Sequence, residues 1–323
     1  MSLGGSGSRG KPRLDDVDIR GGHRCCGPDR GKIIKILDQR GEERVMGGRL
    51  LLAGAALSVA VWMMPGGAAL GQTGTAATAP SSAAEFQPPK RRRIVLMRHG
   101  DVKYFDAQGK PVSDPDSVTL TELGQQQADA AGRYLAGLGV KSFDRVVTSN
   151  LPRTIETAQR VLASGGITGQ RIEIPALREI RAGAATRGVP SEQLPAILLA
   201  VTKPSVAPET KFLGGESIGD MQKRVYASID TLLEDDSWDN ALIVLHAVVN
   251  SAIVSRALTG EQSFMGRFES GAGCFHVLDA AKTWSDWIVR AYNVCARPDD
   301  YSGPRVNTME KLLIQSLKGR SSN

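Results

Sequence analysis

A short apolar segment that ends in two basic residues and a glycine constrains this chain more than any other feature. Residues 94–97 form an uninterrupted apolar run typical of a buried strand, and Arg98, His99 and Gly100 follow directly. Ligands of open α/β sheets bind outside the carboxyl ends of the strands. Gly100 lets the backbone approach a ligand closely, and the Arg98 guanidinium matches the geometry of a phosphate group. We therefore expect an anion-binding site where this strand ends.

Strand-like and helix-like segments alternate along the rest of the chain. Further strands are predicted at residues 143–148, 241–245, 273–278 and 287–292, and helices at 120–138, 152–162, 190–201, 216–233, 248–258 and 308–317. An apolar fraction of 41% is sufficient for the core of one such domain. This alternation predicts a three-layer α/β/α sandwich with a mostly parallel central sheet.

The first 45 residues differ from the rest in composition. They are rich in Gly, Arg and Asp and lack an apolar repeat, so we interpret them as a disordered leader or as a start codon assigned too early, with Met46 as the true start. Most of the net charge of +6 lies within residues 1–49. The remainder carries little excess charge, and we expect no nucleic-acid partner.

An apolar segment follows this leader, and its residues 50–70 carry no charge. Residues 46–71 end in small residues and are predicted to be a signal peptide cleaved before Gln72, or an uncleaved membrane anchor. Residues 72–89 form a flexible linker rich in Ala, Thr, Pro and Ser. Under both interpretations the rest of the chain is exported to the periplasm or the medium. The protein would contact the membrane only if this segment stays uncleaved.

Two further strand ends carry groups of the same chemistry. Arg153 lies in the first turn of a predicted helix, whose amino end attracts anions, and His246 directly follows an apolar strand. Of the four histidines in the chain, His99 and His246 both follow predicted strands, whereas His276 does not. One such histidine is commonly structural. Two of them together with two arginines predict a common phosphate site.

Several ordered motifs resemble the first branch of the histidine phosphatase superfamily, which also contains the phosphoglycerate mutases. The resemblance covers about residues 94–292. It rests on Arg98-His99-Gly100, Leu120-Thr121-Glu122-Leu123-Gly124, Gln127-Ala128, Ser149, Arg153-Thr154, Glu156-Thr157-Ala158, Leu177-Arg178-Glu179, Gly214-Gly215-Glu216-Ser217 and His246. The resemblance implies a catalytic domain at residues 90–300, which a tail at residues 301–323 with a short helix would follow.

The resemblance also implies the roles of the site residues. His99 would be the nucleophile that becomes phosphorylated, and Glu179 would protonate the leaving group. The phosphate-binding residues that it implies are Arg98, Arg153 and His246. A neutral imidazole is a competent nucleophile at neutral pH, so we expect neither a metal nor another cofactor.

The chain departs from the family pattern at several positions, and these differences help to choose between a phosphatase and a mutase. Phe105 stands where many relatives have Asn, and Ala247 stands where Gly commonly follows the second histidine. Residues 180–183 replace an Arg-His-Tyr-Gly stretch of the mutases. We therefore expect a metal-independent, acid phosphatase-type phosphomonoesterase for a small phosphorylated substrate. The alternatives are a phosphoglycerate mutase-like phosphotransferase and an exported phospholigand-binding module that has lost turnover.

Some assignments stay open at this point. Glu179 could instead be an exposed carboxylate paired with a neighbouring arginine. Cys274 and Cys295 could form a disulfide in an oxidising compartment or remain two buried thiols. Residues 182–212 could form a specificity wall or a plain cap helix. The physiological substrate and the oligomeric state are not predicted.

Overall fold

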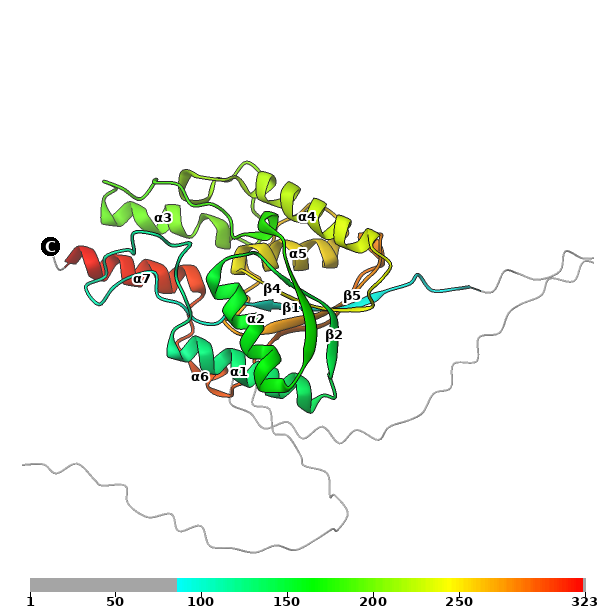
Figure 1. Ribbon diagram of the computed structural model, residues 1–323. Coiled ribbons are helices and arrows are strands. Elements are labelled where there is room, and N and C mark those ends of the chain that lie inside the picture. The colour runs from blue at the N-terminus through cyan, green and yellow to red at the C-terminus, as the bar shows by residue number, and fades with distance from the viewer. Residues whose placement is uncertain (1–85, 322–323) are drawn as a thin grey trace, which may run out of the picture. The chain divides into compact units, whose positions relative to one another are not determined.

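Six strands form one sheet in the computed structural model, which describes residues 86–321. Their bounds are β1 Arg92–Arg98, β2 Ser142–Thr148, β3 Thr168–Glu173, β4 Asn240–Leu245, β5 Phe275–Ala280 and β6 Ile288–Val294. They lie in the order β3-β2-β4-β1-β5-β6 (Figure 1). The first four are parallel, while β5 is antiparallel to β1 and β6 to β5. The predicted mostly parallel sheet is confirmed.

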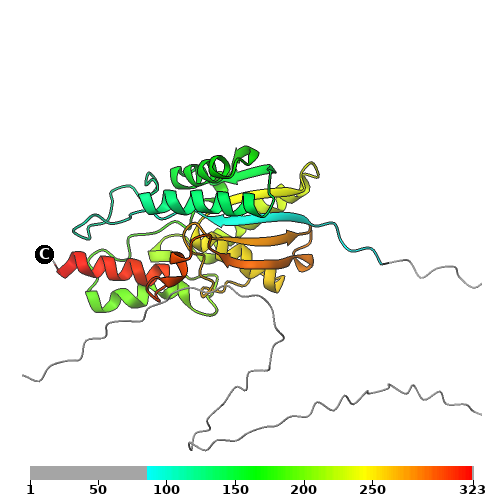
Figure 2. The ribbon, with the colours of Figure 1, turned by 90° about the horizontal axis from the view of Figure 1, so that it is seen from below.

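Helices cover both faces of this sheet, which confirms the predicted three layers. Helices α1 (Glu122–Gly137) and α2 (Pro152–Gly165) lie on one face, and α4 (Ile218–Glu234) and α5 (Ala247–Thr259) lie on the other (Figure 2). Successive side chains of β1 therefore point alternately into the two cores on opposite faces of the sheet. Val95 and Met97 belong to the core beneath α1 and α2, whereas Ile94 and Leu96 belong to the core beneath α4 and α5. Burial on both faces explains the uninterrupted apolar run of β1.

Two details of the predicted elements were wrong. β3 was not predicted, because this edge strand is mostly exposed and lacks an apolar run. The helix predicted at residues 190–201 is broken into a 3₁₀ turn (Ser191–Gln193), the short helix α3 (Leu194–Leu198) and another 3₁₀ turn (Ala200–Thr202). Pro195 lacks an amide hydrogen and is tolerated only in the first turn of a helix, so one continuous helix is excluded there.

The C-terminal helix α7 (Thr308–Ser321) packs against the domain and follows the short helix α6 (Asp299–Ser302). Figures 1 and 2 show α7 beside α3, beyond the carboxyl end of β1. Near its carboxyl end, Arg320 donates hydrogen bonds to the carbonyl oxygens of Thr186 and Val189. Helix α7 thereby closes the end of the sheet at which we expected the site.

Cys274 and Cys295 form a disulfide that joins the start of β5 to the residue after β6. Within residues 86–321, no helix is both long and apolar enough to cross a bilayer. The predicted leader (1–45), the predicted signal peptide or anchor (46–71) and most of the linker (72–89) lie outside the described residues.

Candidate active site

The register between β1 and β4 brings two histidines together. Arg98 of β1 is paired with Leu245 of β4, so the residues that follow, His99 and His246, emerge side by side. Their ring centroids lie 5.3 Å apart in an edge-on arrangement. Both side chains are buried at the carboxyl ends of parallel strands. The two predicted histidines therefore share one site.

One ring nitrogen of His99 is free to act as a nucleophile. Its Nδ1 lies 2.8 Å from the carbonyl oxygen of Gly100. A carbonyl oxygen only accepts hydrogen bonds, so Nδ1 carries the proton and Nε2 keeps its lone pair. Burial lowers the pKa of His99 well below its usual value, and the charges of Arg98 and Arg153 lower it further. The ring is therefore neutral at neutral pH.

The backbone after His99 is held against α1 and α2. A Cβ atom on Gly100 would lie 2.4 Å from the carbonyl oxygen of Gly124 in α1, so only glycine fits this approach. The Gly100 amide donates to Thr157 Oγ1 of α2 at 3.0 Å. Because Thr157 Oγ1 also donates to the carbonyl oxygen of Arg153, the same contact ties the loop after His99 to the first turn of α2.

The Arg98 guanidinium is fixed by residues that are distant in sequence. Its Nη1 donates to the carbonyl oxygen of Ser270 and to Thr308 Oγ1 of α7, both at 2.7 Å. Glu269 lies 3.8 Å from the same nitrogen and accepts hydrogen bonds from Thr308. The amino end of α7 thus contributes directly to the environment of Arg98.

Arg153 is held from the opposite side of the site. It is buried in the first turn of α2, and its Nη1 donates to the carbonyl oxygen of Pro115 at 3.1 Å. The ring of Tyr104 lies 5.9 Å from the guanidinium carbon. Burial raises the pKa of Tyr104, which keeps its hydroxyl protonated and able to donate. Tyr104 was not predicted, because it lies in an irregular loop without a motif.

Three buried nitrogens at this site have no hydrogen-bond partner among residues 86–321: Arg98 Nε, Arg153 Nε and His246 Nδ1. Buried polar atoms are nearly always paired in folded proteins. The other nitrogen of His246, Nε2, lies 2.7 Å from Ser149 Oγ. Burial and the charges of His99, Arg153 and Arg98 lower the pKa of His246 well below its usual value. The two guanidinium nitrogens are hydrogen-bond donors suited to phosphoryl oxygens. His246 Nδ1 is also such a donor when the ring is in the tautomer that carries the proton on Nδ1.

Glu179 lies next to the amino end of α5. Its Oε2 accepts from the Val248 amide at 3.2 Å, and its Oε1 accepts from the Ile180 amide at 2.9 Å. In the part of the chain that the structure describes, the neighbouring arginines have other partners: Arg178 donates to Asn150, and Arg181 donates to Glu216. The carboxylate is therefore placed by backbone amides close to His246, which ends the preceding strand.

An ion pair between half-buried Arg224 and buried Glu216 supports the loop that carries Glu179. Arg224 of α4 donates through Nε and Nη2 to the two oxygens of Glu216, both at 2.8 Å. The same guanidinium donates to the carbonyl oxygens of Ala176, Arg178 and Glu179. Burial raises the pKa of Glu216, but the hydrogen bonds from Arg224 and from the Arg181 amide together outweigh it and lower the pKa. The motif residue Glu216 thus acts through Arg224 on the backbone next to Glu179.

Most of the segment 182–212 is exposed or half-buried, but part of it packs into the core. Leu194, Leu198 and Val201 are buried and belong to the core cluster beneath α4 and α5. These apolar residues therefore pack the domain instead of lining a pocket. Phe105 forms an isolated bridge with Pro111, and Ala247 is the first residue of α5.

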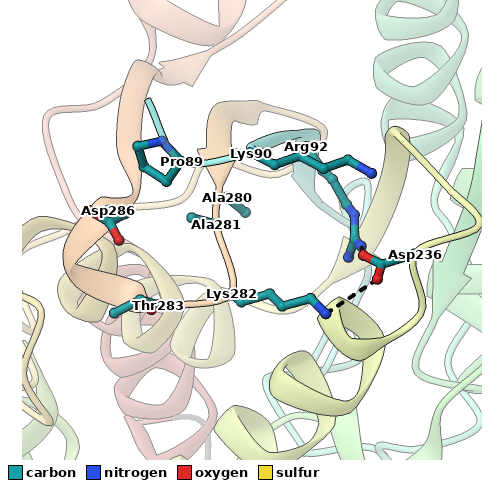
Figure 3. Close-up of a pocket in the computed structure, with 9 residues that line it drawn as sticks. All are labelled: Pro89, Lys90, Arg92, Asp236, Ala280, Ala281, Lys282, Thr283 and Asp286. Atoms are coloured by element: carbon teal, nitrogen blue, oxygen red, sulfur yellow. Dashed lines mark hydrogen bonds and ion pairs between the residues drawn. The ribbon is translucent and has the colours of Figure 1, made fainter. Parts of the chain in front are cut away.

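A pocket lies at the opposite end of the sheet from these residues. It has a volume of about 210 Å³ and is lined by Lys90, Arg92, Asp236 and Lys282, among others (Figure 3). Arg92 is buried, with its guanidinium bonded to Asp236 and to the carbonyl oxygen of Leu233. Asp236 pairs with both Arg92 and Lys282, and Lys282 also pairs with Glu234.

Among the residues that the structure describes, no group of three or more His, Cys, Asp and Glu side chains could hold a metal ion. The groups available at the carboxyl ends of β1 and β4 are therefore a neutral imidazole, two guanidinium groups, a second imidazole and a carboxylate. This set can bind a phosphoryl group and transfer it to a nitrogen nucleophile.

Comparison with known proteins gave one family match and several similar sequences. The family model described as histidine phosphatase superfamily (branch 1) matches residues 94–294. The probable phosphoglycerate mutase GpmB of Yersinia pestis (strain Pestoides F) is 26% identical over 172 residues, which cover 51% of this chain and 74% of that protein. The protein of the same name from Yersinia pseudotuberculosis serotype O:1b (strain IP 31758) matches with the same identity and coverage.

Solved structures of similar proteins were also found. Mycobacterial hydrolase 1 is 23% identical with a TM-score of 0.49, and the match covers 64% of this chain and 100% of that one. The alpha-ribazole phosphatase from Shigella flexneri is 23% identical with a TM-score of 0.48, over 62% of this chain and 96% of that one. The mycobacterial glucosyl-3-phosphoglycerate phosphatase is 22% identical with a TM-score of 0.48, over 64% and 100% of the two chains.

Proposed function

Because the chain belongs to branch 1 of the histidine phosphatase superfamily, we propose that it hydrolyses phosphomonoesters through a phosphohistidine on His99. Members of this superfamily are phosphatases or mutases. The observation that carries the proposal is the hydrogen bond from His99 Nδ1 to the Gly100 carbonyl oxygen. It leaves Nε2 unprotonated in a buried site that also holds two arginines.

The first step transfers the phosphoryl group to the enzyme. His99 Nε2 donates its lone pair to phosphorus while the bond between phosphorus and the ester oxygen breaks. The departing alkoxide takes a proton from Glu179, which must enter this step protonated. Arg98, Arg153 and His246 surround the transferring oxygens, and fixed donors of this kind supply much of the catalysis in phosphoryl transfer.

The second step returns the phosphoryl group to water. Glu179, now a carboxylate, accepts a proton from a water molecule, and the resulting hydroxide attacks phosphorus. The bond between phosphorus and His99 Nε2 breaks, so the imidazole recovers its lone pair and orthophosphate is released. Every proton in this cycle is carried by Glu179, so the proposed reaction requires neither a metal nor another cofactor.

The experiment that tests the proposal measures hydrolysis of an aryl phosphate in excess chelator. We expect full activity in chelator, no activity in His99→Ala, and acid-labile incorporation of labelled phosphate in the wild-type protein only. Arg160→Ala is a matched control, because Arg160 lies on α2 but pairs with Asp129 away from the site. Near-normal turnover of His99→Ala would contradict the covalent mechanism. Loss of activity in chelator would contradict the metal-free reaction.

A second candidate is phosphoglycerate mutase activity, which the name of the Yersinia relatives favours. Incubation with 3-phosphoglycerate separates the two reactions. A phosphatase releases orthophosphate and glycerate, whereas a mutase produces 2-phosphoglycerate without a net release of phosphate. Orthophosphate binding without either reaction would instead support a phospholigand-binding module.

We also propose that the domain is exported. The disulfide between Cys274 and Cys295 supports this, because disulfides persist mainly in oxidising compartments. Cell fractionation together with amino-terminal sequencing of the mature protein tests the proposal. A new amino terminus at Gln72 in the exported fraction would support a cleaved signal peptide, and a full-length chain in the membrane fraction would support an anchor. A protein found only in the cytoplasm would contradict export.

A further inference from the structure

His276 is a buried histidine that the proposed reaction does not use. It lies on β5, where it is paired with Leu96 of β1, and it is 1% exposed. Its ring also packs on the ring of Tyr292, with centroids 4.8 Å apart. Because polar atoms that are buried are nearly always hydrogen-bonded, both ring nitrogens of His276 should have a partner.

Both nitrogens of His276 are hydrogen-bonded in a way that fixes the tautomer. The backbone amide of Asn293 lies 3.0 Å from Nδ1, and an amide can only donate, so Nδ1 is unprotonated. The proton is therefore on Nε2, which donates to Ser270 Oγ at 2.9 Å. Burial lowers the pKa of His276 to about 4, so the neutral ring persists at neutral pH.

The partner of His276 belongs to the turn that holds the phosphate-binding arginine. We name residues 270–274 the Arg98 turn. The carbonyl oxygen of Ser270 accepts from Arg98 Nη1 at 2.7 Å, and the carbonyl oxygen of Cys274 accepts from the Arg98 amide at 3.0 Å. The Gly273 amide donates to the carbonyl oxygen of His99 at 3.1 Å. The turn therefore binds the side chain of Arg98 and the backbone of Arg98 and His99.

Asn293 holds the same turn from β6. Its φ of 50° lies in the left-handed region, beside an irregularity in the pairing of β5 with β6. In this conformation its backbone amide reaches His276, while its side-chain Oδ1 accepts from the Gly271 amide at 2.8 Å. Asparagine tolerates this backbone conformation better than most residues.

We propose that His276 and Asn293 are positioning residues that hold the Arg98 turn, and through the Ser270 carbonyl orient the Arg98 guanidinium for the phosphoryl group. This inference rests on the proposed function and deepens it. A free arginine side chain samples many rotamers, so a guanidinium that is oriented in advance binds phosphate more tightly. No motif of the chain includes His276 or Asn293.

The first test compares variants in their equilibrium binding of orthophosphate, measured by calorimetry. His276→Phe keeps an aromatic ring beside Tyr292 but removes both hydrogen bonds. Asn293→Gly tolerates the positive φ and removes only the contact with Gly271. We expect orthophosphate to bind about tenfold more weakly to His276→Phe than to the wild-type protein. We expect a smaller loss of affinity in Asn293→Gly. Val289→Ala, elsewhere on β6, is the matched control and should bind normally.

The second test is a double-mutant cycle with Arg98→Lys, which keeps the charge but loses the planar guanidinium. If His276 acts through Arg98, His276→Phe should weaken binding little further in the Arg98→Lys background. Additive losses would overturn the inference, as would unchanged affinity in both single variants. Should His276→Phe fail to fold, Asn293→Gly takes its place in the cycle.

These measurements separate this inference from the proposed function. Calorimetry of orthophosphate needs no turnover. A wild-type protein that binds orthophosphate but hydrolyses no phosphomonoester would contradict the proposed function, while a non-additive cycle would still support the positioning role. Normal hydrolysis with an additive cycle would contradict the positioning role alone.

Discussion

The imidazole rings of His99 and His246 lie edge-on with their centroids 5.3 Å apart, at the ends of two adjacent parallel strands. Burial lowers the pKa of both rings, and the nearby Arg98 and Arg153 lower each pKa further. Two protonated rings at this separation beside two arginines would repel strongly. The site is therefore built for neutral histidines and for a ligand that supplies negative charge.

The first prediction concerns the protonation of His99. Since its pKa in the folded protein is below the ordinary value of 6.5, the ring should remain neutral when the pH falls through 6.5. Nitrogen NMR of the free protein should show the Nδ1-protonated neutral tautomer at pH 6. Arg153→Gln removes one cause of the lowered pKa, so the protonation midpoint should move upward. A wild-type midpoint near 6.5 would contradict the prediction.

The second prediction tests Glu179 as the leaving-group acid. Glu179→Gln should lose most activity on alkyl phosphates, whose leaving groups need a proton. It should keep far more activity on an aryl phosphate, because that leaving group departs with little help. The ratio of kcat/KM values for the two substrates is the measurement. Equal losses on both would show that another group donates the proton, and Asp101 would be examined next.

The third prediction concerns Arg153. Its guanidinium is buried, and its Nε has no partner within the described protein. Arg153→Ala should lower kcat/KM by a factor that corresponds to about 3 kcal/mol of transition-state stabilisation. Arg160→Ala on the same helix serves as the control, because its contacts are with Asp129 and Glu156. Similar effects of both substitutions would point to a general defect of α2.

The fourth prediction concerns the ion pair beneath the Glu179 loop. Arg224→Met leaves the Glu216 carboxylate buried without its main partner and frees three carbonyl oxygens. Removal of one member of a fully buried pair costs about 3–5 kcal/mol, and Arg224 is partly exposed, so the free energy of unfolding should fall by about the lower end of this range or less. Activity on alkyl phosphates should fall more than activity on aryl phosphates, since Glu179 is displaced. A fully stable variant would show that the pair is not needed.

The fifth prediction links His276 to the stability of the fold at acidic pH. The unfolded chain binds a proton at His276 near pH 6.5, whereas the folded chain binds it only near pH 4. Stability should therefore fall as the pH decreases through this window, by about 1.4 kcal/mol per pH unit and about 3 kcal/mol in total. Urea unfolding of His276→Phe should show a correspondingly shallower loss. An identical pH dependence in both proteins would contradict the lowered pKa of His276.

The sequence by itself determined the sheet and the residues at its strand ends. The apolar runs of β1 and β4 are long enough to require burial on both faces, which makes a parallel sheet covered by helices the expected structure. In such a sheet, polar residues placed directly after adjacent strands must share one edge. Arg98, His99 and His246 were found on this basis, and Arg153 from the helix that follows β2.

Only the tertiary structure decided what surrounds these residues. Arg98 is held by Ser270 and Thr308, which lie 172 and 210 residues further along the chain. No local pattern marks such partners, because the acceptor at Ser270 is a backbone carbonyl that every residue carries. The pairing of Cys274 with Cys295 likewise depends on how β5 and β6 meet. Local apolar patterns fix the strands, whereas packing between distant segments fixes the orientation of each charged group.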